Sequence, residues 1–202
     1  MSKKIITIGR QCGSGGHTIG KALAEKLNIP LYDREFLEEI SKRSGLSEDV
    51  VEQEGEYSSA NKVFNTATGF YRNYDMKDKA SLPLREQINA YQMEYIKEVA
   101  SQGPCVIVGR CADFILRDRN DCLNVFIHSG LDNRIRRVIE EHRVPDAEAA
   151  KHVKNRDRKR ADHYQYITGQ VWGDVNNYHI CLDSGVFGID TCIELIVKCY
   201  KD

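Results

Sequence analysis

Short apolar runs alternate along this chain with stretches in which apolar residues recur every three or four positions. The apolar runs predict strands at 4–8, 31–32, 105–108, 122–128 and 178–182. The helical spacing predicts helices at about 18–27, 34–43, 83–101, 131–142, 146–166 and 189–200. Strands that alternate with helices are typical of a mostly parallel sheet covered on both faces, so a three-layer α/β fold is expected.

Several helix ends carry their own signals. Ser129 with Asp132 has the pattern of a capping box, and N-caps are predicted at Ser47, Asp146 and Asp190. The helix over 83–101 is expected to bury one stripe, formed by Leu84, Ile88, Tyr91, Tyr95, Ile96 and Val99. The sequence Gln-Gly-Pro at 102–104 should end it.

Residues 55–80 break the alternation because they are polar, aromatic and only weakly periodic. A loop of this length in a compact domain is usually a lid, a flap that binds the acceptor, or a locally disordered segment. All three interpretations stay open.

The overall charge gives no sign of a large polyanionic partner. The chain has 202 residues and a formal net charge of −1, which suits one domain and provides no field that attracts nucleic acid or an anionic membrane. No signal-like segment or apolar membrane span is present in the sequence, and a cytoplasmic location is expected. The seven cysteines form no CxxC pair, so most are expected to be buried free thiols.

The ten residues from Gly9 to Thr18 carry the clearest chemical signal. They read Gly-Arg-Gln-Cys-Gly-Ser-Gly-Gly-His-Thr and connect the first predicted strand to the first predicted helix. A glycine-rich turn at a helix N-terminus brings main-chain N–H groups close to an anion, so this loop is expected to bind phosphate. The alternative is an ordinary glycine-rich turn before a helix.

The loop departs from the pattern GxxxxGK[ST] at its lysine. If Gly15 is the second glycine of the pattern, Gly16 stands where the lysine should be. Another cation must then replace it, with Arg10, His17 or arginines from elsewhere as candidates, or activity must be poor. Thr18 remains in place to offer a hydroxyl to a metal-bound phosphate.

Arginines elsewhere in the chain are candidates for that charge. Runs at 134–137 and 154–160 include Arg156 and Arg160, whose i, i+4 spacing lets them reach one oligophosphate. The same runs are also typical of a solvated helix face or of a small RNA-binding surface. Arg110 follows Gly109 at the end of a predicted strand, where ligands of open α/β sheets bind; a salt bridge to the next helix is the alternative.

Together these segments resemble the cytidylate kinase-like branch of the P-loop nucleoside monophosphate kinases. The similarity covers nearly the whole chain, from Ile-Thr-Ile-Gly-Arg-Gln-Cys-Gly-Ser-Gly-Gly at 6–16 to the last strand, the turn and the start of the final helix at 181–190. Arg85 with Gln92 resembles the family's V-R-x-x-L-x-x-x-Q helix, and Val108-Gly109-Arg110 resembles its D-G-R-D segment. The regions 129–137 and 156 onward resemble the family's A-S-x-x-x-R-x-x-R and lid patterns.

The resemblance implies a P-loop α/β/α fold with a five-stranded parallel sheet, a helical lid and an acceptor-binding insertion. We expect a single domain over 1–202, with the insertion at about 33–82 and the lid at about 143–170. ATP and Mg²⁺ are the implied cofactors, and a phosphorylated small molecule is the implied partner. Nucleic acid and membrane are not expected as partners.

The implied roles fall on residues from four parts of the chain. The nucleotide would lie on Gly13, Ser14, Gly15, Gly16, His17 and Thr18, with the metal at Thr18. The acceptor would meet Arg85, Arg110 and Asp33, and catalysis would use Arg10, Arg110, Arg156 and Arg160. The chain departs from the family at Gly16, Val108 and Cys111, and Asp113 is expected to compensate for the last of these.

The sequence therefore favours transfer of the ATP γ-phosphoryl group to a nucleoside monophosphate or a similar phosphorylated acceptor. A second interpretation is a catalytically weak nucleotide-binding sensor or regulatory protein that lacks the P-loop lysine. A third is an RNA-binding helix pair over 134–160.

Overall fold

The computed structural model describes residues 4–33, 35–54 and 79–201. Its five strands form one sheet in the order β2-β3-β1-β4-β5, and every pair of neighbours is parallel. The strands are β1 (Ile5–Arg10), β2 (Leu31–Tyr32), β3 (Cys105–Val108), β4 (Cys122–His128) and β5 (Ile180–Asp183). The predicted five-stranded parallel sheet is confirmed.

Helices occupy all six segments for which helical spacing was found. They are α1 (Gly16–Leu27), α2 (Glu35–Ser44), α5 (Leu84–Gln102), α7 (Leu131–His142), α8 (Asp146–Thr168) and α10 (Ile189–Lys201). Shorter pieces were not predicted as elements, because one or two turns are too short to show a period: α3 (Glu48–Glu54), α6 (Ala112–Ile115), α9 (Ser184–Phe187), and the 3₁₀ turns Lys79–Ser81 and Val175–Asn177. For the expected loop at 55–80, residues 55–78 lie outside the described residues.

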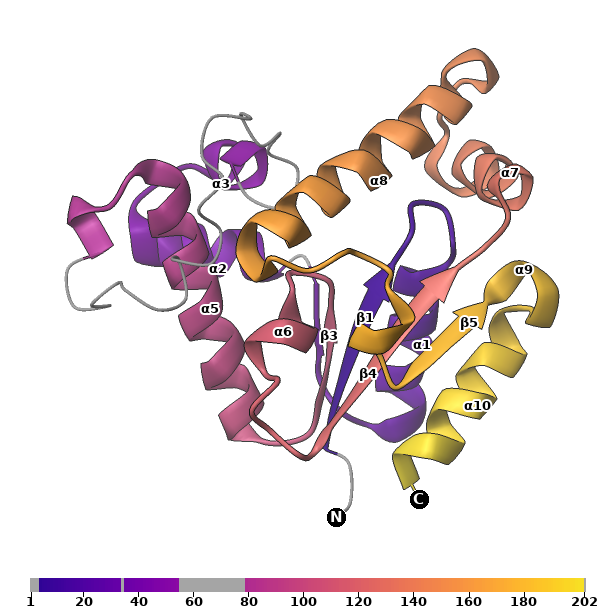
Figure 1. The fold of residues 1–202 in the computed structure, drawn as a ribbon, viewed down its shortest axis with the longest axis horizontal. Helices are drawn as coiled ribbons and strands as arrows, with labels where there is room; N and C mark the ends of the chain where they lie inside the picture. Colours follow the sequence, from indigo (N-terminus) through magenta and orange to yellow (C-terminus); the bar gives the residue numbers. More distant parts are fainter. Residues whose placement is uncertain (1–3, 34, 55–78, 202) are drawn as a thin grey trace.

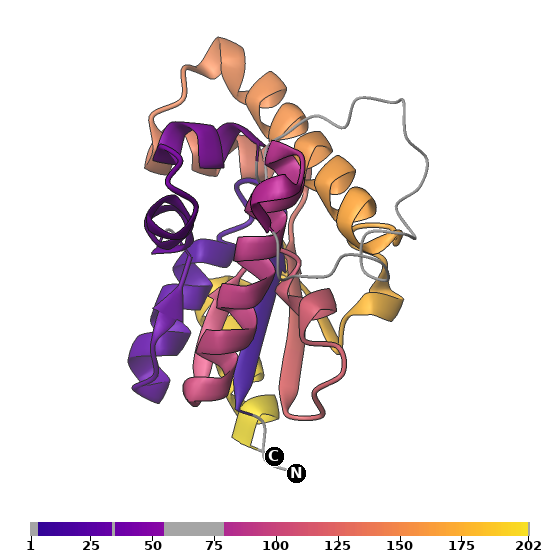
Figure 2. The same ribbon diagram turned by 90° about the vertical axis from the view of Figure 1, so that its left-hand side faces the viewer.

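Helices cover both faces of the sheet (Figures 1 and 2), and an apolar core lies between the sheet and each layer of helices. Ile5 and Ile107 join the core shared with α2, α5 and α6, whereas Ile6, Ile8 and Val108 join the core shared with α1 and α10. Alternate residues of the same strands are therefore buried on opposite faces, as a parallel sheet covered by helices requires. The α/β/α class is confirmed.

The carboxyl ends of the strands define one edge of the sheet. The glycine loop leaves β1 there, the Gly109 turn leaves β3 beside it, and α8 passes over this edge in Figure 1. Ligands of open parallel sheets bind at this edge, so the fold brings the candidate segments to one place.

Several predicted helix ends are wrong in detail. α7 begins after Gly130 with no side-chain cap, so the capping box at Ser129 is not formed, and Asp146 and Asp190 lie inside first turns. There their carboxylates still favour the positive end of the helix dipole. Ser47 does cap α3, since its Oγ accepts from the N–H of Val50 at 3.4 Å.

The buried face of α5 also differs from the expected stripe. Leu84 is exposed, while the polar side chains of Asn89 and Gln92 are buried. Gly103 follows α5 as predicted. Of the cysteines, Cys199 is exposed and Cys181 is half-buried, and the other five are buried free thiols.

No helix among the described residues is both long enough and apolar enough to cross a membrane.

Candidate phosphate-binding site

The glycine loop turns back on itself between β1 and α1 through two left-handed residues. Gly13 has φ +73° and Gly15 has φ +78°, a backbone conformation that residues other than glycine rarely adopt. A Cβ on Gly13 would also lie 2.5 Å from the carbonyl oxygen of Arg134. The loop therefore needs glycine at these positions both for its backbone conformation and for its close packing on α7.

Side chains from outside the loop hold its carbonyl groups. Four consecutive or nearly consecutive oxygens accept hydrogen bonds, with the following donors and distances: Arg160 Nη1 to Arg10 O (3.1 Å), Arg134 Nη1 to Cys12 O (3.3 Å), Arg137 Nη1 to Gly13 O (2.9 Å) and Ser184 Oγ to Ser14 O (2.6 Å). These donors come from α7, α8 and α9. Nothing in the sequence pattern indicates this role for Arg134, Arg137 or Ser184.

The N–H groups of Gln11, Cys12 and Ser14 are hydrogen-bonded, but other main-chain N–H groups of the loop have no partner in the part of the chain that the structure describes. No hydrogen bond to any residue that the structure describes is made by the main-chain N–H groups of Gly13, Gly15, Gly16, His17 and Thr18. Successive N–H donors at a helix N-terminus form an anion site. The side chains of His17 and Thr18 are exposed at this end of α1.

The Asp157 carboxylate of α8 binds the main chain of the loop. Its Oδ1 accepts from the N–H of Cys12 at 2.7 Å, and its Oδ2 pairs with Arg134. The interaction joins α7, α8 and the loop through a buried arginine and a half-buried aspartate. α8 is therefore fastened to the loop at two points, Asp157 and Arg160.

Arg10 and Gly16 lie against each other across the loop. A Cβ on Gly16 would be 2.5 Å from Cβ and 3.0 Å from Cγ of Arg10. In the pattern GxxxxGK[ST], with Gly15 as the second glycine, position 10 is the first glycine and position 16 the lysine. Here the two residue types are exchanged, so the cationic side chain extends from the end of the strand and not from the start of the helix.

The Arg10 guanidinium extends across the end of the sheet. It packs on Gly109, where a Cβ would collide with Nη1, and its Nη2 lies 3.7 Å from Oδ1 of Asp33. His17 Nδ1 is 2.6 Å from the other oxygen of Asp33. The predicted acceptor residue Asp33 therefore links the glycine loop to the segment that leads into α2.

The turn after β3 holds Arg110 in an unusual conformation. Gly109, Arg110 and Cys111 are left-handed in succession, with φ +76°, +58° and +53°. Residues other than glycine adopt this backbone conformation at a cost in free energy, and such strained residues are often found at functional sites. Arg110 is buried, and its Nη1 lies 3.4 Å from Oε1 of Gln92.

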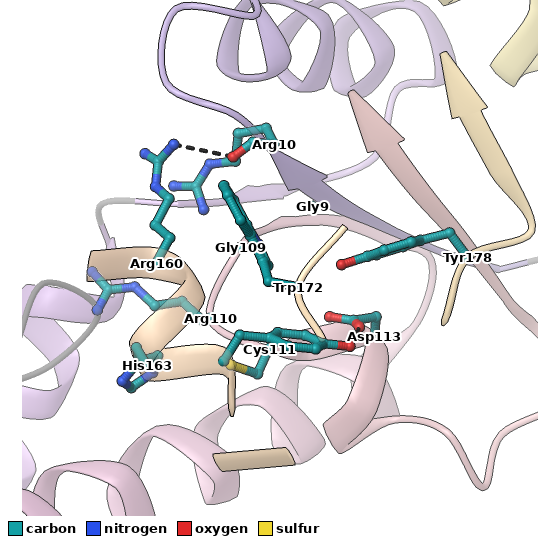
Figure 3. Close-up of a pocket in the computed structure, with 11 residues that line it drawn as sticks. Gly9, Arg10, Gly109, Arg110, Cys111, Asp113, Arg160, His163, Trp172 and Tyr178 are labelled. Carbon is teal, nitrogen blue, oxygen red and sulfur yellow. Dashed lines mark hydrogen bonds between the residues drawn. The ribbon is translucent and has the colours of Figure 1, made fainter. Parts of the chain in front are cut away.

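Three of the four predicted catalytic arginines meet at one small cavity. Arg10, Arg110 and Arg160 line a space of about 20 Å³, the size of a single water, between Gly9 and Gly109. In Figure 3 the three arginines lie on one side of this cavity, and Asp113 and Tyr178 lie on the other. They come from β1, the β3 turn and α8, so only tertiary structure brings them together.

The other predicted residues lie around this centre. Arg85 of α5 stacks on the Tyr166 ring of α8, with its Cζ 3.9 Å from the ring centroid. Arg156 is half-buried on α8 and does not line the cavity. Within the described residues, no group of three His, Cys, Asp or Glu side chains has the arrangement of a metal site.

Asp113 is buried beside the arginine cavity. Tyr164 Oη donates to its Oδ2 at 2.6 Å, which ties α6 to α8. Burial raises the pKa of Asp113 to about 6, and the hydrogen bond from Tyr164 opposes part of that rise. Tyr178, which lines the same cavity, has its pKa raised by burial and by the charge of Asp113.

The parallel sheet and the glycine loop before α1 define the chain as a P-loop kinase fold. Among solved structures, shikimate kinase from Bacteroides thetaiotaomicron is similar in fold, with a TM-score of 0.52, 15% identity and 97% of each chain covered. An uncharacterized protein from Eubacterium ventriosum is similar at 30% identity and a TM-score of 0.72, with 98% of each chain covered.

The family is equally clear from sequence comparison. The model of the cytidylate kinase-like family matches residues 5–186, and the chain therefore belongs to that family. A cytidylate kinase from Methanocaldococcus jannaschii is 23% identical, covering 95% of this chain and 94% of the relative, and one from Methanopyrus kandleri is 22% identical, covering 95% and 90%. Family membership and the kinase fold support a nucleotide kinase-like function.

The exchange of residue types at positions 10 and 16 leads to a stability prediction. Gly16→Ala should lower the free energy of unfolding by about 1–3 kcal/mol, because the new Cβ forces the Arg10 stem to move. Urea unfolding measures the change. Gly130→Ala is the control, since no atom lies within 4 Å of its Cβ position and its φ is −55°; it should cost less than about 1 kcal/mol. Equal stability of Gly16→Ala and wild type would contradict the packing described.

The pKa of Asp113 leads to a pH prediction. The folded protein binds the Asp113 proton more tightly than the unfolded chain does. The contribution of Asp113 to the free energy of unfolding therefore decreases as pH rises through about 6. Asp113→Asn cannot titrate but can still accept from Tyr164. Its unfolding free energy relative to wild type should rise by about 1.4 kcal/mol between pH 5 and pH 8. Chemical denaturation of both proteins at the two pH values tests this, and a difference that does not change with pH would refute the raised pKa.

Proposed function

We propose that this protein transfers the γ-phosphoryl group of ATP to a nucleoside monophosphate or a similar phosphorylated acceptor. The observation that carries the proposal is the convergence of Arg10, Arg110 and Arg160 on one cavity at the sheet edge where the glycine loop leaves β1. Five N–H groups of that loop have no hydrogen-bond partner within the described chain. Phosphoryl transfer needs charge neutralisation and positioning more than it needs covalent chemistry. An acceptor phosphate oxygen attacks the γ-phosphorus, the bond to the β–γ bridging oxygen breaks, and ADP leaves.

The glycine loop is the proposed site of the ATP phosphates. The N–H groups of Gly13, Gly15 and Gly16 would donate to phosphate oxygens, and the helix N-terminus would favour their negative charge. Ser14 shapes this loop through its own Oγ, which donates to the carbonyl of Gln11 at 2.9 Å. Mg²⁺ would be held by the Thr18 hydroxyl together with the phosphates, and its charge would neutralise the transferring group.

Arg10 is the proposed replacement for the missing lysine. Its stem occupies the space in which a side chain at position 16 would start, and its guanidinium reaches the end of β3. Asp33 lies near one edge of this guanidinium, which fixes its orientation. Arg110 and Arg85 would hold the acceptor phosphate, and Arg156 and Arg160 would add charge from α8, the proposed lid helix.

An acceptor panel tests the reaction. ADP release from ATP and Mg²⁺ should depend on one of CMP, dCMP, UMP, AMP or GMP. Arg110→Ala should lower kcat/KM for that acceptor by roughly ten- to a hundredfold, because a charge-assisted hydrogen bond to phosphate is lost. Nucleotide binding without acceptor-dependent ADP release would favour the sensor interpretation instead. RNA affinity that falls steeply with salt would favour the RNA-binding one.

The role of Arg10 has its own test. Arg10→Ala should reduce kcat by roughly ten- to a hundredfold, because the cation that replaces the lysine is removed. Arg136→Ala is the matched control: this arginine is exposed on α7, and its side chain donates to Asn133 of the same helix, so its loss should leave turnover unchanged. Steady-state kinetics at saturating ATP measures both. An Arg10→Ala enzyme with the wild-type kcat would contradict the proposal that Arg10 replaces the lysine.

A further inference from the structure

One face of α5 carries three polar side chains, and the last of them contacts Arg110 of the site. Arg85, Asn89 and Gln92 are spaced i, i+4 and i+7, which places them on the same side of the helix. At one end of this row Arg85 stacks on Tyr166 of α8, and at the other end Gln92 meets Arg110. Asn89 lies between them.

The two buried amides of this row differ in their hydrogen bonds. Gln92 contacts both the side chain and the carbonyl oxygen of Arg110, at 3.4 and 3.5 Å. Asn89 is only 1% exposed, and neither its Oδ1 nor its Nδ2 bonds to any residue that the structure describes. Its neighbours Ile88 and Met93 belong to the apolar core. The polypeptide therefore satisfies one amide and leaves the other without a partner.

Arg85, one turn away on the same helix, also has buried polar atoms without hydrogen-bond partners in the described chain. Its Nε and Nη2 are buried atoms that make no hydrogen bond within the described chain. The stacking on Tyr166 holds the guanidinium plane but uses none of its N–H donors. Two adjacent residues on one helix face thus present unpartnered polar atoms, which in proteins are uncommon and call for an explanation.

Stability alone does not account for an asparagine at this position. A leucine of similar size would add to the core and would leave no amide without a hydrogen-bond partner. The amide offers one donor group and one acceptor side by side, next to a cation. This combination suits a ligand that has a hydroxyl or amino group close to its anionic group.

We propose that Asn89 is a specificity-determining residue, which hydrogen-bonds a hydroxyl or amino group of the acceptor beside the phosphate held by Arg85. The inference rests on the proposed function, because it concerns the acceptor of the same transfer. An acceptor of this class is a nucleoside monophosphate, which carries both a phosphate and hydroxyl or amino groups. A phosphorylated molecule without such groups would gain nothing from Asn89.

The test is Asn89→Leu, measured in the full-length protein. Its melting temperature should equal or exceed that of wild type, since no amide is left unsatisfied. The KM for the best acceptor of the panel should rise about tenfold or more, while the KM for ATP stays unchanged. Asn89→Asp should also raise the acceptor KM, because its carboxylate competes with the phosphate for Arg85.

Asn124→Leu is the matched control. Asn124 accepts from Thr7 Oγ1 at 2.8 Å, so its loss should lower the melting temperature and leave both KM values unchanged. If Asn89→Leu behaves like Asn124→Leu, or if its acceptor KM equals that of wild type, Asn89 is structural and the proposal is overturned. Such a result leaves the phosphotransferase function intact.

Failure of the proposed function gives a different pattern. If wild type releases no ADP with any monophosphate, inorganic phosphate and CMP become probes in thermal denaturation. Protection of wild type by CMP that exceeds protection by phosphate, and that Asn89→Leu loses, retains the ligand role of Asn89. Equal protection of both proteins, or protection of neither, overturns it.

Discussion

The site depends on where the carbonyl groups of the glycine loop are held. Arg134, Arg137, Arg160 and Ser184 bind them from outside the loop, and the N–H groups of Gly13 and of residues 15–18, which have no partner within the described chain, are left for an anion. A loop of small residues has no apolar core of its own, so its shape is set by these bonds. Because the donors belong to α7, α8 and α9, the anion site forms only when those helices have packed.

The exchange between positions 10 and 16 follows from the same crowding. The P-loop pattern places a glycine at the strand end and a lysine at the helix start, and this chain has Arg10 and Gly16 instead. The Cβ distance of 2.5 Å explains why both positions cannot carry side chains in this backbone arrangement. A positive charge is kept at the loop, but it extends toward Gly109 and Asp33.

The centre of the site is more polar than stability alone would select. Asp113 is buried beside Tyr164, Arg110 occupies a left-handed conformation, and Asn89 has no hydrogen-bond partner within the described chain. Each feature costs free energy that the surrounding apolar cores must offset. They cluster at the carboxyl ends of β1 and β3, where a kinase of this fold needs charge and hydrogen-bonding groups.

Local pattern determined the strands, the long helices and the glycine loop, because hydrophobic period and glycine spacing depend on neighbouring residues only. It also indicated Arg10, Arg110 and Arg160 as candidates, from residue type and position. Only tertiary structure decided that these three line one cavity, since they are up to 150 residues apart. The same holds for the loop-binding role of Arg134 and for the burial of Asn89, because a side chain's partners depend on how distant elements pack.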